Sequence, residues 1–137
     1  GAGAQVAMRN ALSMAGIDQS QIGYVNAHAT STAVGDAAEI AGLSAVFTGR
    51  GKDLAVSSTK SATGHMLGAA GAFEAVVSVM ALREGMLPPT INLEDPEEEA
   101  DKFDLVPNMA KAKSVDYALS NSFGFGGVNA ALVFGRI

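Results

Sequence analysis

Apolar residues recur along the chain with two different periods, and these periods predict the secondary structure. Residues 3–15 carry apolar side chains at helical spacing, and Gly16 directly after them is a common helix stop. Residues 22–27 predict a short strand that leads into a polar loop. Residues 31–47 predict a helix with Ser and Thr caps at its start. Residues 54–59 predict a second short strand that ends in hydroxyl side chains.

The second half of the chain continues with a helix, a long connection and a strand pair. Between residues 66 and 84, a run rich in Gly and Ala predicts a buried helix, and Glu74 is the single charge between residues 66 and 82. This run is slightly short for a bilayer and is charged near its middle, so the interior of a globular protein fits better than a membrane. Residues 85–104 hold three prolines and an acidic cluster, which predicts a surface connection with a solvated acidic face. Residues 117–137 predict two strands around a glycine-rich turn.

The resulting order is α-β-α-β-α-loop-β-β, which is typical of an α/β fold. Alternating strands and helices favour a mixed, mainly parallel sheet with helices on both faces, and the final strand pair should be antiparallel. We treat residues 1–137 as one domain, because that length suffices for one core. A βαβ arrangement usually starts with a strand, whereas a helix comes first here. We therefore expect the chain to be part of a larger unit.

Composition narrows the classes of function. Hydrophobic residues make up 48% of the chain and charged residues 17%, which is typical of a compact domain. The net charge of −5, with scattered basic residues, argues against a nucleic-acid partner. Without cysteine, the chain offers neither a disulfide, nor a thiolate metal site, nor a thiol nucleophile. We see no signal-peptide pattern and expect a cytoplasmic protein without a membrane partner.

The chain holds two histidines, and each follows a predicted strand. If the two strands are parallel, His28 and His65 reach the same edge of the sheet, where α/β proteins bind ligands. The alternative is a pair of unrelated polar loop residues. Glu74 lies within an apolar helix and needs a partner, for which Lys60 is the nearest cation in the sequence. His65 and Glu74 would lie on opposite faces of a regular helix, so His65 should precede the helix in a loop.

Two further patterns are weaker. The segment NSFGFGGVN places Phe123 and Phe125 among glycines, which permit positive φ and close approach to a ligand. Taken alone, it is more often a glycine-rich hairpin turn. Two histidines without clustered carboxylates or thiols make a poor metal site, so we predict no metal. No phosphate-binding glycine motif is present, and we predict no cofactor.

Taken together, three motifs resemble one enzyme family. NAHATST, STKSATGHMLGAAG and SNSFGFGGVNAALVF stand in this order along the chain. They are similar to the C-terminal half of a β-ketoacyl-acyl-carrier-protein synthase, of the type II condensing enzymes that elongate fatty acids (the synthase II kind). The resemblance implies a thiolase-like fold of two similar halves, with the nucleophilic cysteine in the N-terminal half. These residues would then be the C-terminal ketosynthase domain of a longer acyltransferase and inactive alone.

The resemblance also implies roles for individual residues. His28 and His65 would donate hydrogen bonds to the enolate oxygen that forms when malonyl-carrier protein loses CO₂. Lys60 and Glu74 would form a supporting ion pair. Substrate contacts would come from Thr30, Thr32, Phe123, Phe125, Gly126 and Gly127, of which Phe125 would gate the acyl pocket. The implied partners are an acyl carrier protein with its phosphopantetheine arm, the N-terminal half of the synthase and a second copy in a homodimer.

Three alternatives share part of this pattern. A degradative thiolase has a similar GHxxGxxG stretch, but the histidine of NAHAT argues against it. A polyketide ketosynthase would carry a proline after Asp36, where this chain has Ala37. A non-catalytic chain-length-factor-like subunit fits the missing cysteine. It does not fit the retention of both histidines together with Lys60 and Glu74.

Overall fold

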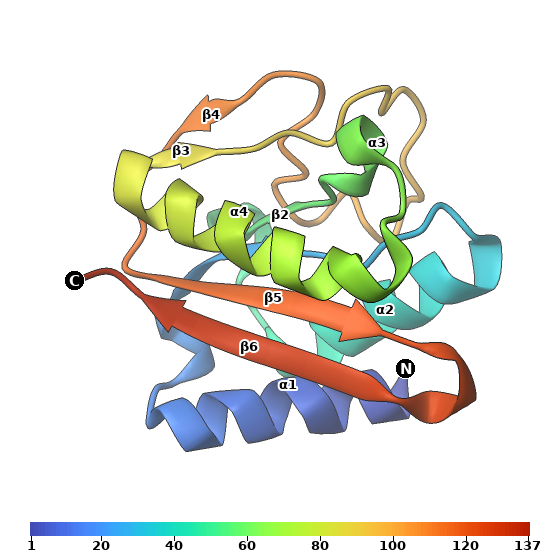
Figure 1. Ribbon diagram of the computed structural model, residues 1–137, viewed down its shortest axis with the longest axis horizontal. Helices are drawn as coiled ribbons and strands as arrows, with labels where there is room; N and C mark the ends of the chain where they lie inside the picture. Colours follow the sequence, from blue (N-terminus) through green and yellow to red (C-terminus); the bar gives the residue numbers. More distant parts are fainter.

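A four-stranded mixed sheet forms the centre of the computed structural model, which describes residues 1–137 (Figure 1). Its strand order is β2-β1-β5-β6. The strands are β1 (Ile22–Asn26), β2 (Ala55–Ser57), β5 (Tyr117–Phe123) and β6 (Asn129–Gly135). Strand β1 is parallel to both β2 and β5, and β5 pairs antiparallel with β6. The predicted mainly parallel sheet with a final antiparallel pair is therefore confirmed.

The register of the parallel strands brings their carboxyl ends together. Asn26 at the end of β1 lies opposite Ser57, the last residue of β2. On its other side, Asn26 lies opposite Ser120 in β5. The loops that follow β1, β2 and β5 consequently leave from one edge of the sheet.

Helices cover both faces of the sheet, as the alternating pattern predicted (Figure 1). Helices α1 (Ala2–Ala15) and α2 (Ala33–Val46) cover one face, and α4 (Ala70–Glu84) covers the other. Helix α1 ends at Gly16, whose φ of 67° is the left-handed conformation that glycine adopts without a Cβ penalty. Thr32 precedes α2, but its side chain makes no capping hydrogen bond. The predicted hydroxyl cap is wrong because the Thr32 hydroxyl bonds to that of Thr30, 3.1 Å away.

Side chains of the central strands alternate between two cores. Val25 and Leu119 pack with α1 and α2, whereas Tyr24 and Ala118 pack with α4. This alternation follows from the two-residue period of a strand. Ile22 joins the core of Val25 rather than that of Tyr24, because the register of β1 against β5 shifts between Ile22 and Tyr24.

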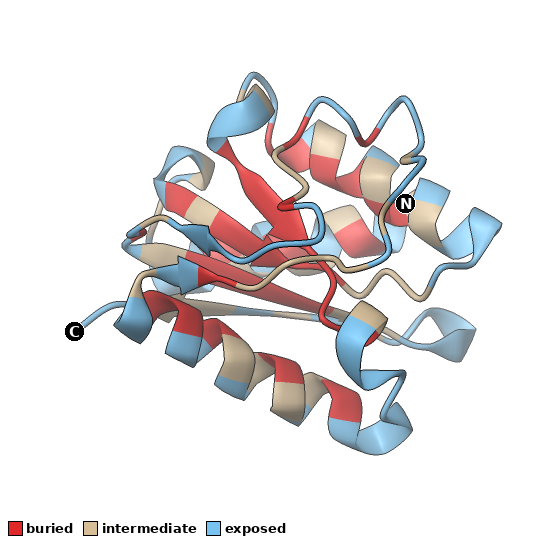
Figure 2. Cartoon of the chain, turned by 90° about the horizontal axis from the view of Figure 1, so that it is seen from above, coloured by how far each residue is buried: buried red, intermediate tan, exposed pale blue.

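The glycine- and alanine-rich helix is shorter and less buried than its composition predicted. A 3₁₀ turn, η3 (Leu67–Ala69), precedes α4, which begins at Ala70. Only the side of α4 that faces the sheet is buried, and Val76 on its outer side is 61% exposed (Figure 2). The predicted burial is therefore confirmed for the side of α4 that faces the sheet and wrong for its outer side, which nothing in this chain covers. No helix has both the length and the apolar character needed to cross a membrane.

The long connection between α4 and β5 is more ordered than a plain surface loop. Its strands β3 (Met86–Leu87) and β4 (Lys111–Ala112) form a two-stranded antiparallel sheet. The acidic run 97–99 is exposed, as predicted, but Phe103 nearby is buried in the core. Lys52 holds this part of the segment by donating to the Phe103 carbonyl at 2.9 Å. The remaining short elements are η1 (Gln19–Gln21), η2 (Gly51–Asp53), α3 (Lys60–Thr63) and η4 (Phe125–Gly127).

The close approach of Gly23 to Val115 leads to a test of this packing. A Cβ on Gly23 would lie 2.4 Å from Val115 Cγ1, and Val115 is buried in the core beneath α4. We expect Gly23→Ala to lower the free energy of unfolding by about 1–3 kcal/mol, the usual cost of overpacking. Gly68→Ala is the matched control, since a Cβ there meets no atom within 4 Å. Urea denaturation of both variants measures the difference, and equal midpoints would contradict this packing.

Candidate active site

The two histidines come together at the carboxyl edge of the sheet. His28 lies in the loop after β1, and His65 lies in the loop between α3 and η3. Their ring centroids are 5.5 Å apart, with the ring planes at 85°. His65 precedes the helix rather than lying in it, as the spacing to Glu74 predicted. Parallel strands thus place two imidazoles, 37 positions apart in the numbering, at one spot.

A backbone hydrogen bond determines which nitrogen of His65 carries the proton. The Leu67 N–H donates to His65 Nδ1 at 3.1 Å, so Nδ1 is an acceptor. The neutral ring therefore bears its hydrogen on Nε2. Leu67 has a φ of 51°, a left-handed value that is uncommon for leucine. The chain adopts this conformation where it turns its N–H back toward the exposed His65 ring.

His28 is held in its neutral form. Partial burial, and after it the proximity of Lys60 and His65, together lower the pKa of His28 from 6.5 to about 4. Its ring also lies beside Phe123, with centroids 6.0 Å apart and planes at 59°. At neutral pH, the pair of rings can act as hydrogen-bond donors without carrying the charge of an imidazolium at His28.

Glu39 fixes the backbone of the His28 loop, and the sequence analysis did not identify it. Its carboxylate accepts the N–H groups of His28 at 3.0 Å and Ala29 at 2.8 Å, and Asn121 Nδ2 donates to it at 3.0 Å. Glu39 comes from α2 and is only 3% exposed. Burial raises its pKa, and the bonds from Ala29, Asn121 and His28 oppose that rise. A charged residue four positions before Leu43, on the apolar side of a predicted helix, was the available signal.

Lys60 and Glu74 form a buried ion pair, so Glu74 does not face solvent. Lys60 is 8% exposed and Glu74 2%, and the Lys60 ammonium donates to Glu74 Oε1. Lys60 begins α3, three positions after β2 ends at Ser57, and Glu74 points inward from the second turn of α4. The pair joins these two elements beside the histidines. Because both charges are out of water, each depends on the other for compensation.

The remaining predicted residues lie at the same edge but are more open. Thr30 and Thr32 precede α2 and bond to each other. Phe125 is fully exposed in the loop between β5 and β6, and Gly126 and Gly127 there have φ values of 76° and 80°. These positive φ values agree with the predicted glycine-rich turn. Within this chain the loop leaves Phe125 beyond the packed core.

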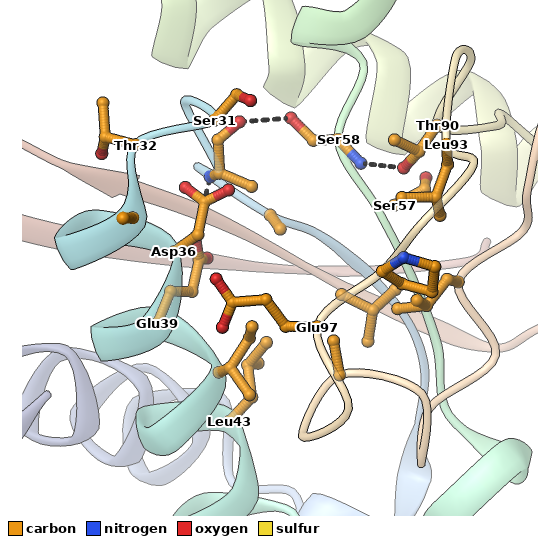
Figure 3. A pocket seen from close by; sticks show the side chains of 18 of the residues that line it. Ser31, Thr32, Asp36, Glu39, Leu43, Ser57, Ser58, Thr90, Leu93 and Glu97 are labelled. Carbon is orange, nitrogen blue, oxygen red and sulfur yellow. Dashed lines mark hydrogen bonds between the residues drawn. The ribbon is translucent and has the colours of Figure 1, made fainter.

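A cavity of about 310 Å³ lies behind the histidine loop (Figure 3). It is enclosed by α2, the ends of β1 and β2, and the segment 90–105, and none of the predicted catalytic residues lines it. The Ser58 hydroxyl donates to the Ala29 carbonyl at 3.0 Å, and the Ser58 N–H donates to the Thr90 hydroxyl at 2.9 Å. These two bonds tie the cavity wall to the loop that carries His28. The histidines therefore face a different surface from this cavity.

Comparison with known families agrees with this arrangement. The family described as "Beta-ketoacyl synthase, C-terminal domain" matches residues 1–94. The chain belongs to the β-ketoacyl synthase family and corresponds to its C-terminal domain. The fold is the thiolase-like one that the three motifs implied.

Individual relatives give the same result. The chain is 53% identical over 138 residues to a protein of Vibrio harveyi named 3-oxoacyl-[acyl-carrier-protein] synthase 2, covering 100% of this chain and 33% of the relative. A solved ishigamide ketosynthase/chain length factor matches with a TM-score of 0.92 at 34% identity, over 98% of this chain and 32% of that one. A type II polyketide ketosynthase in complex with its acyl-carrier protein also matches with a TM-score of 0.92, at 31% identity, over 98% and 33%. The chain thus spans about one third of the length of these proteins.

The low pKa of His28 leads to a prediction about its titration. The His28 ring should titrate near pH 4 rather than near its ordinary value of 6.5. NMR titration of the histidine ring signals, assigned with the His28→Asn variant, measures this directly. A midpoint close to 6.5 would contradict the burial of the ring and its proximity to Lys60.

The lowered pKa of His28 also makes the free energy of unfolding depend on pH. Because the folded pKa lies below the unfolded value, the contribution of His28 to stability is complete above pH 6.5 and is lost as the pH falls toward 4. The His28→Asn variant should show a weaker decline in the free energy of unfolding across this pH window.

The buried ion pair leads to a separate prediction about stability. Lys60→Met should lower the free energy of unfolding by about 3–5 kcal/mol, because it leaves the Glu74 carboxylate buried without a partner. The double variant Lys60→Met/Glu74→Leu should recover most of that loss, because no charge remains to be compensated. Urea denaturation of the single and double variants measures both effects. A double variant less stable than Lys60→Met would argue against a mutually dependent pair.

Proposed function

We propose that this chain is the C-terminal, histidine-bearing domain of a 3-oxoacyl-acyl-carrier-protein synthase that elongates fatty acids. One observation carries the proposal, namely the two imidazole rings 5.5 Å apart at the ends of neighbouring parallel strands. The relative from Vibrio harveyi carries the name of this activity at 53% identity, and this chain covers 33% of it. The activity is accordingly proposed for the complete protein.

The proposed reaction has one difficult charge to stabilise. When malonyl-carrier protein loses CO₂, the electrons of the breaking C–C bond pass into the thioester carbonyl, whose oxygen becomes negative. Hydrogen-bond donors aimed at that oxygen lower the barrier, and loss of one such donor typically costs about 10²–10³ in rate. The enolate carbon then attacks the acyl thioester carbonyl and forms the new C–C bond. The enzyme thiolate leaves as the second product of that step.

We assign the two donors to His28 and His65. The Leu67 N–H occupies Nδ1 of His65 at 3.1 Å, which leaves Nε2–H as the donor. The low pKa of His28 keeps its ring neutral at working pH. Two neutral donors stabilise an enolate without protonating it, whereas an imidazolium could transfer its proton to the carbanion and quench it. The positive charge of Lys60 beside His28 favours this neutral form.

The supporting residues receive roles that match their positions. Lys60 and Glu74 orient the site electrostatically, and Glu39 holds the His28 loop in place. Thr30 and Thr32 would bond to the pantetheine arm at the edge of the sheet, and Phe123 would form a wall of the acyl site. The exposed Phe125, on the loop that contains Gly126 and Gly127, would gate the acyl pocket.

The proposal requires parts that these 137 residues do not supply. The sequence has no cysteine, so the nucleophile comes from elsewhere in the complete protein. An acyl carrier protein delivers the acyl and malonyl groups, which agrees with the solved complex of a related ketosynthase with its carrier protein. By family resemblance, we propose that the complete protein works as a cytoplasmic homodimer without a cofactor.

Two related functions are distinguished by upstream sequence and substrate. A chain-length-factor-like subunit would lack the nucleophile throughout its length, so glutamine in place of cysteine in the complete protein would favour it. A polyketide ketosynthase would condense several malonyl units on one carrier. The sequence identity of 53% to the 3-oxoacyl-[acyl-carrier-protein] synthase 2 of Vibrio harveyi, against 31% to the polyketide ketosynthase, favours fatty acid elongation.

The donor assignment predicts a separation of two partial reactions. In the complete protein, His28→Ala or His65→Ala should reduce malonyl decarboxylation by about 10²–10³ while leaving acyl transfer to the enzyme measurable. Radiolabelled acyl-carrier protein measures the transfer, and release of ¹⁴CO₂ from malonyl-carrier protein measures decarboxylation. Thr48→Ala is the control, because Thr48 is exposed and follows the end of α2 that is opposite to the His28 loop. Unchanged decarboxylation in both histidine variants would refute the assignment.

A further inference from the structure

Buried side chains at the ends of β1 and β2 form a series of hydrogen bonds that the proposed reaction does not use. Tyr24 and Asn26 lie on β1, Ser57 ends β2, and Thr59 follows it. All four are at most 6% exposed, and Tyr24 and Asn26 are completely buried. Burial of hydroxyl and amide groups is costly unless each finds a partner, so their hydrogen bonds define their orientation.

The bonds run in one direction. The Ser57 hydroxyl donates its single hydrogen to the Pro88 carbonyl at 2.6 Å. In its contact with Tyr24 Oη at 3.0 Å, Ser57 must therefore accept, and the Tyr24 phenol donates. Tyr24 Oη in turn accepts from Asn26 Nδ2 at 3.2 Å. The order is thus Asn26 to Tyr24 to Ser57 to Pro88.

The other amide hydrogen of Asn26 bonds to the segment that follows β2. Asn26 Nδ2 also lies 3.3 Å from Thr59 Oγ1, to which it donates. Both hydrogens of the amide are then used, while its Oδ1 has no hydrogen-bond partner in this structure. Asn26 stands two residues before His28, and Thr59 stands directly before Lys60. This series of hydrogen bonds therefore links the two backbone segments from which the site residues project.

The phenol keeps its donor hydrogen under all working conditions. Burial raises the pKa of Tyr24 to about 12, and its hydrogen bonds with Ser57 and Asn26 oppose that rise. No other side chain reaches both Asn26 and Ser57 in this chain of bonds. Replacing the phenol by a phenyl ring would remove the hydrogen bond that Ser57 accepts and leave one Asn26 hydrogen unpaired, without changing the apolar packing.

We propose that Tyr24 is a positioning residue for the decarboxylation step. Its hydroxyl joins the ends of β1 and β2 through Asn26 and Ser57, and so holds His28 at the correct separation from Lys60 and His65. This inference rests on the proposed function. It assigns Tyr24 no contact with the substrate, because Tyr24 is completely buried.

The test compares the two tyrosines of the chain in the complete protein. Tyr24→Phe removes the hydroxyl that bonds to Ser57 and Asn26. Tyr117→Phe is the matched control, because the Tyr117 hydroxyl makes no hydrogen bond to a protein group. Tyr24→Phe should lower kcat of malonyl decarboxylation on the order of tenfold, since sub-ångström misplacement of a donor has effects of that size. KM for malonyl-carrier protein and the rate of acyl transfer should match those of Tyr117→Phe. The NMR signals of both histidine rings should shift in Tyr24→Phe alone.

Ser57→Ala provides a second route to the same link. Ser57→Ala should reproduce the kcat loss, and Tyr24→Phe/Ser57→Ala should be no slower than the slower single variant, because both break one chain. If Tyr24→Phe fails to fold, Ser57→Ala carries the test alone.

Three results have distinct meanings. Decarboxylation by Tyr24→Phe at the rate of Tyr117→Phe would overturn the inference. A loss shared equally by acyl transfer and decarboxylation, with the double variant additive, would also overturn it, since that is the behaviour of general destabilisation. Absence of decarboxylation in the unmodified complete protein would instead overturn the proposed function itself.

Discussion

The parallel pairing of β1 with β2 and β5 is the constraint on which the rest of the structure depends. Parallel strands end at the same edge, so the loops that follow them leave side by side. The first loop carries His28, the second leads through Lys60 to His65, and the third carries Phe125. An antiparallel arrangement of β1 and β2 would place the two imidazoles at opposite ends of the sheet. The proximity of the two imidazoles is therefore a consequence of strand direction.

Buried polar groups then hold these loops in a defined conformation. Glu39 holds the His28 backbone through two N–H groups, and the Lys60–Glu74 pair joins the start of α3 to α4. Such groups contribute little net stability, because desolvation offsets much of their attraction. Their effect is on geometry, since a partner that moves leaves a buried charge or donor unpaired. The same Lys60 charge also helps to keep His28 neutral.

Much of the fold could be predicted because it depends on local pattern. The helix stop at Gly16, the strand pair around the glycine-rich turn and the loop position of His65 all follow from spacing and residue type. The extent of α4 burial could not be predicted, because Val76 is as apolar as a core residue and only the layers around the helix decide its exposure. The anchoring of the acidic connection by Phe103 and Lys52 was missed for the same reason, since that contact joins distant parts of the chain.

For the site, the sequence by itself determined which chemistry was available: two imidazoles, one buried carboxylate with a nearby lysine, and no thiol. It also determined that both histidines follow strands, because the apolar runs before them are short and bounded by polar residues. Only the tertiary structure decided that Glu39 bonds to the backbone of the His28 loop and that Tyr24 bonds to Ser57. Their partners, Asn121 and Ser57, lie 82 and 33 positions away, and no local period encodes contacts between segments so far apart. Hydrogen-bond direction and the tautomer of His65 likewise arise only when the chain is folded, because each is set by the group that happens to face it.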